Sequence, residues 1–211
     1  MSAGPTTRDR ILDAALRLFA ERGYHGTTVG DIEQAAGLTP RAGGLYRHFR
    51  SKRHVLEAAL ERPVAENQAI LSAMELMPLG DLRAELVLLG RWTLQHLERQ
   101  SAFLRVLLRD GDQFPDLVAA YHRRAVLPSH REAAAWLRRK LRQEGLPPHD
   151  CDAVAAAAIA ALVGYHMDRL VFGRPPGDVD QERFLNAWAD AWVAAVRAPI
   201  RKEDSREPSG P

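Results

Sequence analysis

Residues 23–60 decide the fold, and they read GYHGTTVGDIEQAAGLTPRAGGLYRHFRSKRHVLEAAL. Thr28 can cap a helix in which Asp31, three residues later, completes a capping box. Thr39 is followed by Pro40, which is tolerated at the first position of a helix because the N–H that it lacks would be unpaired there anyway. The stretch therefore predicts two short helices in succession, with a glycine between them.

Helix signals continue on both sides of these two segments. Before them, apolar residues at helical spacing predict a longer helix that Thr6 or Thr7 caps and that Gly23 ends in the left-handed conformation. The second short helix is expected to span residues 39–49, and Ser51 can cap a further helix that follows it. Two short helices that pack on a longer one describe a helix-turn-helix.

The rest of the chain has the periodicity of helices and no convincing strand pattern. Pro63 is expected to kink or break the chain near Glu61 and Arg62. Residues 199–211 are charged and contain Pro and Gly, so we expect a disordered tail there. The expected helices span residues 63–74, 79–98, 102–110, 115–144 with a break near Pro128, 150–172 and 180–197. The sequence thus predicts an all-α protein of about nine helices.

The composition excludes several protein classes. Hydrophobic residues make up 46% of the chain and charged residues 27%, which fits a folded globular protein rather than a disordered tail or a coiled-coil rod. The single cysteine, Cys151, allows no internal disulfide and no zinc finger. The N-terminus lacks the pattern of a secretory signal, and the apolar run at residues 153–165 is shorter than a membrane span needs. We therefore expect a cytoplasmic protein with no membrane partner.

Charge is unevenly distributed along the chain. Residues 1–56 contain nine Lys or Arg and five Asp or Glu, a net charge of +4, whereas the remainder has a net charge of −2. Positive charge therefore gathers around the predicted helix-turn-helix, as a nucleic-acid partner requires.

Residues 23–60 resemble the DNA-binding domain of the TetR family of transcriptional repressors. The resemblance covers about the first quarter of the chain, and the rest is similar only in being helical and of the usual length. One departure is the distance from Gly37 to Tyr46, which is nine residues, two more than is usual in the family. The extra residues fall within residues 40–44 and lengthen the turn or the start of the helix that reads DNA. The matching elements are Gly23-Tyr24, Thr27-Thr28-Val29, Asp31-Ile32, Ala36-Gly37-Leu38-Thr39, Leu45-Tyr46-Arg47-His48-Phe49 and Ser51-Lys52.

The resemblance implies a three-helix DNA-binding domain at residues 1–56 and a helical effector-binding and dimerisation domain at residues 57–198. It also implies that the Tyr46 hydroxyl contacts a DNA phosphate and that His48 lies near the DNA backbone. Arg41 is the expected base reader, because a guanidinium can pair with guanine O6 and N7. The predicted DNA-binding residues are Thr28, Thr39, Arg41, Gly43, Tyr46, Arg47, His48, Ser51 and Lys52.

Each of these residues also has a purely structural interpretation. Thr28 and Thr39 can cap helices without touching DNA, and Arg41 can be a solvated surface charge. Gly43 and Gly44 would permit close approach to DNA, but they can also simply weaken a helix, where glycine costs up to about 1 kcal/mol relative to alanine. The functional interpretation therefore depends on the whole pattern and not on a single residue.

The last two expected helices have faces suited to a partner. One has small residues at helical spacing, which allow close helix approach, and the other has an aromatic stripe. An intrachain core is the alternative interpretation, but a reader of symmetric DNA needs two half-sites and the family pairs through its final helices. We therefore expect a homodimer whose interface includes Ala156, Ala160, Phe184, Trp188 and Trp192.

The middle of the chain offers candidates for a ligand pocket but no motif that identifies one. Each candidate can equally be structural, and His96, His166 and Cys151 lack the spacing of metal ligands. The motifs of common hydrolases, nucleotide-binding enzymes and zinc proteases are absent from the sequence, so we expect neither an enzyme nor a cofactor. The candidate pocket residues are Trp92, His96, Arg105, Tyr121, Trp136, Tyr165 and His166.

The function that these observations favour is ligand-responsive repression of transcription. The protein is expected to bind a palindromic operator in double-stranded DNA as a dimer and to be released by a small, mostly apolar effector. Two alternatives stay open at this point. One is a helical protein-interaction module without sequence-specific DNA binding, and the other is a small helical enzyme.

Overall fold

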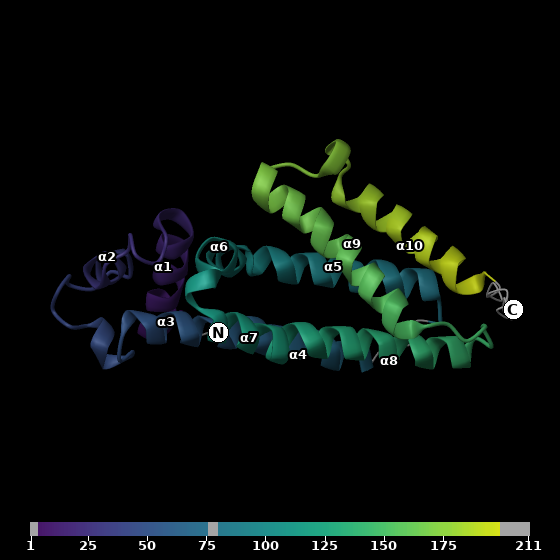
Figure 1. Ribbon diagram of the computed structural model, residues 1–211, viewed down its shortest axis with the longest axis horizontal. Coiled ribbons are helices and arrows are strands. Elements are labelled where there is room, and N and C mark those ends of the chain that lie inside the picture. Colours follow the sequence, from purple (N-terminus) through teal and green to yellow (C-terminus); the bar gives the residue numbers. More distant parts are fainter. Residues whose placement is uncertain (1–3, 76–79, 199–211) are drawn as a thin grey trace, which may run out of the picture.

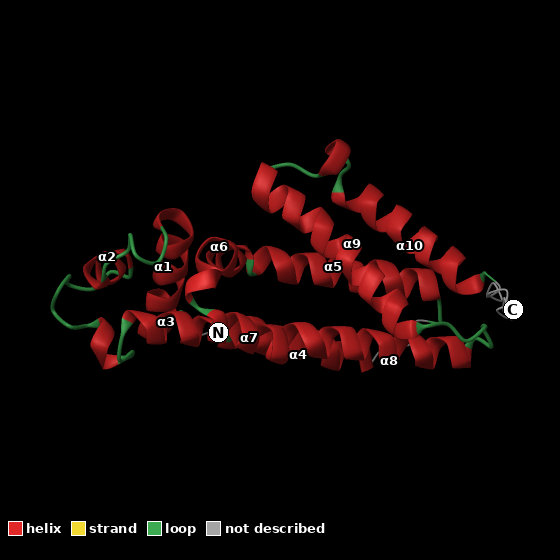
Figure 2. Ribbon diagram, in the orientation of Figure 1, coloured by secondary structure: helices red, strands yellow, loops and turns green. Residues whose placement is uncertain are grey.

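The computed structural model describes residues 4–75 and 80–198 (Figure 1). Helices account for all the regular structure in these residues, and no strand occurs among them (Figure 2), so the predicted all-α class is confirmed. The tail predicted to be disordered, residues 199–211, lies outside the described part. The α-helices in that part are α1 (Thr7–Arg22), α2 (Val29–Ala35), α3 (Lys52–Ala59), α4 (Glu61–Glu75), α5 (Leu82–Arg99), α6 (Ser101–Asp110), α7 (Pro115–Tyr121), α8 (Leu127–Gln143), α9 (Cys151–Phe172) and α10 (Gln181–Arg197).

Local capping explains where the first helices begin and end. Thr6 and Asp9 form a capping box at α1, and Thr28 and Asp31 form another at α2. Ser51 Oγ accepts from the backbone N–H of His54, at 3.0 Å, and so caps α3. Gly23 ends α1 with φ 81° and ψ 163°, a positive-φ conformation that is essentially restricted to glycine, and not the left-handed helical one that we predicted.

Two of the predicted helix breaks are present. Leu60 alone separates α3 from α4, and Pro63 lies in the first turn of α4. The chain therefore breaks close to the predicted position. The break near Pro128 takes the form of a π-helical segment, His122–Val126, between α7 and α8. A proline ring clashes with the carbonyl four residues earlier, which belongs here to Arg124 inside the widened turn. The sequence therefore located the break, and the proline explains it.

The hydrophobic residues form two clusters. The first cluster lies between α1, α2 and α3, and Phe103 and Val106 of α6 and Leu117 of α7 complete it. Two hydrogen bonds fix this contact: the Tyr24 backbone N–H donates to Asp110 Oδ2 at 2.9 Å, and Arg109 donates to the Glu21 carbonyl at 3.1 Å. The N-terminal helices therefore share their core with α6 and α7, and the boundary near residue 56 is not a gap in the packing.

The second cluster joins α5, α8, α9 and α10, in the part of the molecule farthest from α2 (Figure 1). Gly90 allows α5 and α10 to approach closely, because a Cβ there would lie 2.7 Å from the Cδ2 atom of Leu185. Lys140 and Glu85 form a buried ion pair in this cluster, with Nζ and Oε1 2.6 Å apart. The bundle is thus held by close helix contact and by one paired charge inside it.

Candidate nucleic-acid interface and ligand cavity

The segment between α2 and α3 differs from the prediction. The helix expected at residues 39–49 is absent, and that prediction was wrong. Residues 40–44 form successive turns, and Leu45–Arg47 make one 3₁₀ turn. Arg41 has a φ of 61° and Gly43 has a φ of 73°, and neither value belongs to a right-handed helix. We call residues 39–44 the 39–44 loop.

The carboxylate of Glu33 fixes this loop from α2. Its side chain is completely buried, and its two oxygens accept from the backbone N–H groups of Arg41, at 2.7 Å, and Leu45, at 3.0 Å. Hydrogen bonds to a charged acceptor are stronger than neutral ones. Glu33 therefore accepts hydrogen bonds from two loop N–H groups that would donate to backbone carbonyls if the segment were a helix.

Sequence reasoning missed Glu33, although a signal was available. Val29, Ile32 and Ala36 mark the inward face of α2, and Glu33 has the spacing of that face. A carboxylate at an inward position needs buried donors, because an unpaired buried charge is very unfavourable. An acidic residue on the apolar face of a short helix before a Gly-rich segment therefore predicts an acceptor for loop N–H groups.

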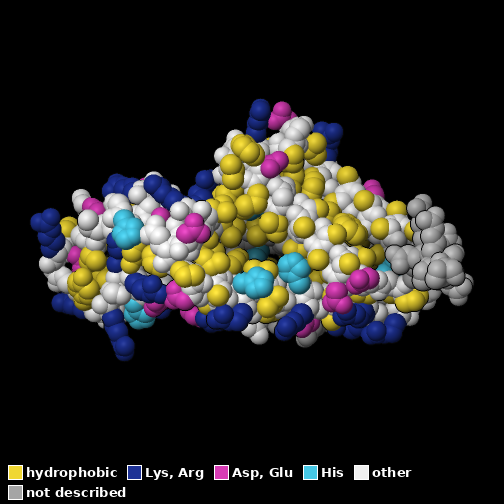
Figure 3. All heavy atoms as spheres, in the orientation of Figure 1, with side chains coloured by type: hydrophobic (Ala, Val, Ile, Leu, Met, Phe, Trp, Pro, Cys, Tyr) yellow, Lys and Arg dark blue, Asp and Glu magenta, His cyan; other side chains and the backbone are white. Residues whose placement is uncertain are grey.

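The exposed side chains of this region are those that the resemblance implies for DNA contact. Tyr46 is 58% exposed, and Thr39, Arg41, Arg47 and His48 are exposed as well. The Arg41 side chain passes beside Gly30 in the first turn of α2. The loop thus brings the side chain of Arg41 next to the N-terminus of α2, where backbone N–H groups favour anions. Lys and Arg side chains project around the N-terminal helices in Figure 3.

Thr28 and Ser51 lie at the starts of α2 and α3, and both are exposed. The Thr28 hydroxyl donates to Asp31 Oδ2 at 2.6 Å and accepts from the Asp31 N–H at 3.1 Å. Hydrogen bonds from Thr28 lower the pKa of the Asp31 carboxyl below its usual value. The Thr28 side chain is therefore occupied by capping, and it is the exposed helix start that is available to a phosphate.

Lys52 has a different role from the predicted phosphate contact. Its Nζ donates to the carbonyls of Tyr24, at 2.7 Å, and Thr27, at 2.8 Å. It also lies 4.1 Å from the centre of the Tyr24 ring, and burial lowers the pKa of its ammonium. The ammonium is turned inward and ties α3 to the connection between α1 and α2.

We expect Lys52→Ala to lower the free energy of unfolding by about 1–3 kcal/mol, because two carbonyls lose a charged donor. Thermal and urea unfolding measure this loss, with Arg50→Ala as a control that removes an exposed neighbouring charge. Unchanged stability together with a smaller salt dependence of DNA binding would instead support the phosphate contact that the sequence predicts for Lys52.

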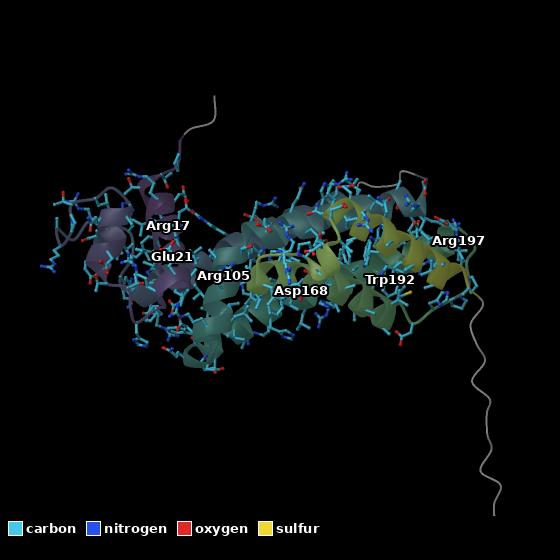
Figure 4. The ribbon with its side chains drawn as sticks, turned by 90° about the horizontal axis from the view of Figure 1, so that it is seen from above. Arg17, Glu21, Arg105, Asp168, Trp192 and Arg197 are labelled. Carbon is cyan, nitrogen blue, oxygen red and sulfur yellow. The ribbon has the colours of Figure 1, made fainter. Side chains whose placement is uncertain are left out.

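A cavity of about 200 Å³ lies in the second cluster, between α4, α5, α8, α9 and α10. Of the seven candidate pocket residues, His96, Tyr121 and Trp136 line it. The other four, Trp92, Arg105, Tyr165 and His166, are not among the described residues that line the cavity. In Figure 4, Arg105 lies toward the α1 residues Arg17 and Glu21, well separated from Trp192.

The aromatic stripe of α10 belongs to the core of its own chain. Trp188 and Trp192 line the cavity, and Trp188 Nε1 donates to the Ala158 carbonyl at 3.1 Å. Phe184 stacks on Tyr165, with ring centres 4.2 Å apart. Trp188 is buried within its own chain, and Phe184 and Trp192 are partly buried against it. The i+4 spacing thus identifies an apolar face but not the chain that covers it.

The small-residue face of α9 is exposed instead. Ala156 and Ala160 are both exposed, and hydrophobic side chains gather over α9 and α10 in Figure 3. By length and composition α9 could cross a membrane, but one such helix is weak evidence because core helices of soluble proteins share these properties. Only 28% of its most apolar stretch is buried in this chain, so α9 has an apolar face open to a partner.

Tyr121 connects the cavity with the first cluster. Its hydroxyl donates to Gln100 Oε1 at 3.1 Å, and its ring packs on Phe103 with centres 5.3 Å apart. Gln100 also contacts the ring of His96, with Nε2 and Nδ1 2.9 Å apart, and burial lowers the pKa of His96. A residue that lines the cavity thus also packs against the core beneath α1.

Comparison with known proteins supports the resemblance to the TetR family. Residues 11–59 match the family described as "Bacterial regulatory proteins, tetR family". The chain is 25% identical to YvkB, an uncharacterised HTH-type transcriptional regulator of Bacillus subtilis (strain 168), over 91% of this chain and 98% of that protein.

Two solved structures share the fold. A putative TetR-family regulator from Mesorhizobium loti superposes with a TM-score of 0.70 at 23% identity, over 90% of this chain and 96% of its own. AibR, in complex with isovaleryl coenzyme A and operator DNA, superposes with a TM-score of 0.63 at 22% identity, over 92% of this chain and 100% of its own. Residues 11–59 therefore match the DNA-binding domain of the TetR family of transcriptional regulators, and the chain as a whole has the fold of solved TetR-family proteins.

Proposed function

We propose that this protein is a ligand-responsive repressor that binds a palindromic operator as a homodimer and leaves it when a small molecule occupies the cavity. The observation that carries the proposal is Tyr121, which lines the cavity and packs on the core of the N-terminal helices. An occupant that favours one position of Tyr121 would shift the equilibrium between DNA-binding and released forms. We place the protein in the cytoplasm and expect no catalytic activity.

We assign DNA binding to residues 1–56 and effector binding and dimerisation to residues 57–198. In this proposal Tyr46 contacts a phosphate and Arg41 reads a base from the 39–44 loop. Thr28, Thr39, Gly43, Arg47, His48 and Ser51 complete the DNA surface, whereas Lys52 serves the fold. The exposure of Arg41 and Tyr46 and the positive charge of residues 1–56 support this assignment.

The first test of this surface compares Arg41→Ala with Tyr46→Phe. Arg41→Ala should lower the preference for one base position by about 1–3 kcal/mol, because base-edge contacts carry sequence information. Tyr46→Phe should weaken binding to all duplexes alike, because phosphate contacts carry no sequence information. Fluorescence anisotropy measures both, on a duplex selected by the wild-type protein from random sequence and on its single-base variants.

Arg139→Ala on α8 is the control, since it removes an exposed charge outside the proposed surface. An equal loss on the selected and on random duplexes for Arg41→Ala would refute the base-reading role. A wild-type protein that shows no sequence preference at any salt concentration would instead favour the helical interaction module.

We assign the dimer interface to the exposed small residues of α9, with exposed alanines of α10 beside them. The proposed interface includes Ala156 and Ala160 and leaves out the aromatic residues of α10, which pack against their own chain. Close packing of small residues brings two helices near each other, as in the contact of α5 with α10 at Gly90. A second copy of this chain is the occupant that a palindromic operator requires.

A further inference from the structure

Trp136 has a buried donor without a partner. The residue is 6% exposed and lines the cavity, and its Nε1 has no hydrogen-bond partner among the described residues. Buried indole N–H groups normally have a partner. Trp188, which lines the same cavity, follows this rule, since its Nε1 donates to the Ala158 carbonyl at 3.1 Å. Trp136 therefore contributes to the cavity wall a ring whose buried N–H no described residue satisfies.

The cavity provides no counter-ion. None of the described residues that line it is Asp, Glu, Lys or Arg. Lys140 follows Trp136 by four residues in α8, but its buried ammonium is paired with Glu85, with Nζ and Oε1 2.6 Å apart. His96 and His130 line the cavity, and burial lowers the pKa of His96, which favours its neutral form. A carboxylate or a phosphate inside would lose its hydration without a compensating cation.

The shape and the walls of the cavity favour a ring. Three indoles, those of Trp136, Trp188 and Trp192, contribute to its lining. An apolar cavity of about 150 Å³ is enough to bind benzene in another protein, and the cavity here has about 200 Å³. Aromatic side chains pack well against flat rings. The available space therefore suits one small ring system.

We infer that the effector is an uncharged, ring-containing molecule with a hydrogen-bond acceptor, and that the indole N–H of Trp136 recognises this acceptor. The inference rests on the proposed function of the cavity as the effector site. It sets this chain apart from AibR, whose structure contains isovaleryl coenzyme A, because coenzyme A carries phosphates that this cavity cannot neutralise. Trp136 is thus the specificity-determining residue of the site.

Three probes of similar shape separate the parts of this inference. 2-Acetylnaphthalene is neutral and has a carbonyl acceptor, 2-ethylnaphthalene lacks the acceptor, and 2-naphthoate carries a charge. Calorimetric titration of the full chain measures their affinities for the wild type, for Trp136→Phe and for Trp92→Phe. Trp92 is the matched control, because it is a partly buried tryptophan that is not among the described residues lining the cavity.

Trp136→Phe keeps an aromatic ring but removes the N–H. We expect it to lower the affinity for 2-acetylnaphthalene about five- to tenfold more than the affinity for 2-ethylnaphthalene, which is the contribution of one buried hydrogen bond. Any loss of ring contact affects both probes alike and cancels in this comparison. Trp92→Phe should change neither affinity, and 2-naphthoate should bind the wild type at least a hundredfold more weakly than the ketone.

Nuclear magnetic resonance of the wild-type protein gives an independent measurement that needs no variant to fold. The indole N–H signal of Trp136 should move downfield when 2-acetylnaphthalene is added and should not do so with 2-ethylnaphthalene. Equal losses for both neutral probes in Trp136→Phe, or a downfield shift with both, would overturn the role of Trp136. Tight binding of 2-naphthoate would overturn the uncharged class. Both results would leave the effector site intact, whereas no binding of any probe would overturn the proposed function and the inference with it.

Discussion

Glu33→Gln is expected to weaken operator binding about thirtyfold. Both carboxylate oxygens accept from backbone N–H groups in a fully buried place. A glutamine has one acceptor oxygen, so its amide leaves the N–H of Arg41 or of Leu45 unpaired and turns its own donors toward it. Hydrogen bonds to charged groups contribute about 1.5–3 kcal/mol each. A loop that has lost one of them is less ordered, so ordering it on DNA takes free energy from binding.

Fluorescence anisotropy on the selected duplex measures the loss, and hydrogen exchange at the Arg41 and Leu45 amides reports the loop itself. Glu21→Gln is the matched control, since it makes the same chemical change at an exposed position of α1. Should Glu33→Gln retain wild-type affinity and slow exchange at both amides, the carboxylate would not be what holds the loop.

The second large effect is expected from Ala160→Arg, which should convert the dimer into a folded monomer and lower operator affinity at least a hundredfold. Ala160 is exposed on α9, so the arginine should not disturb the chain itself. In an interface of two close helices its length and charge would hold the copies apart. One half-site alone then supplies the contacts, and the avidity of two linked half-sites is lost.

Light scattering after size exclusion gives the mass, and circular dichroism gives the helix content. Ala65→Arg makes the same change at an exposed position of α4 and should leave the dimer intact. A charged residue at Trp188 is no substitute for this test, because Trp188 is buried in its own chain and an unpaired charge there would destabilise the fold. If Ala160→Arg is still a dimer, the interface lies elsewhere.

Most helices could be predicted from the sequence because their signals are local. The helix expected at residues 102–110 is α6 (Ser101–Asp110), and the helix expected at residues 180–197 is α10 (Gln181–Arg197). Asp180 caps α10 by accepting from the Arg183 N–H at 2.9 Å, and the two residues are only three apart in the sequence. Where caps and apolar spacing agree within a few residues, the chain needs no distant partner to choose its conformation.

The 39–44 loop could not be predicted in this way, because distant contacts decide it. Thr39 and Pro40 have the local pattern of a helix start, but Glu33 binds N–H groups eight and twelve residues away. Arg41 adopts a positive φ, which local preferences disfavour for a side chain of this kind. The hydrogen bonds from the Arg41 and Leu45 N–H groups to Glu33 outweigh these local preferences. A sequence pattern does not show that these two N–H groups lie within reach of one carboxylate.

The same limitation applies to the side chains of the site. A lysine in a basic segment fits a phosphate contact, and only the geometry places the Lys52 ammonium on two carbonyls of its own chain. Apolar spacing along α10 marked one apolar face and led us to expect Trp188 and Trp192 in a dimer interface, whereas both line the cavity of their own chain. Core residues, cavity walls and interfaces all consist of apolar side chains, so composition does not separate them.

The loop held by Glu33 also affects how this protein can change its sequence preference. Each residue of an α-helix turns the chain by about 100°, so one inserted residue re-aims every side chain that follows. The 39–44 loop is held at the amides of Arg41 and Leu45, with residues 42–44 between them. Insertions between these two points can be absorbed without moving Tyr46. In the DNA surface that we propose, base specificity could therefore change through residues 42–44, by divergence or by grafting, while the phosphate contact assigned to Tyr46 stays in place.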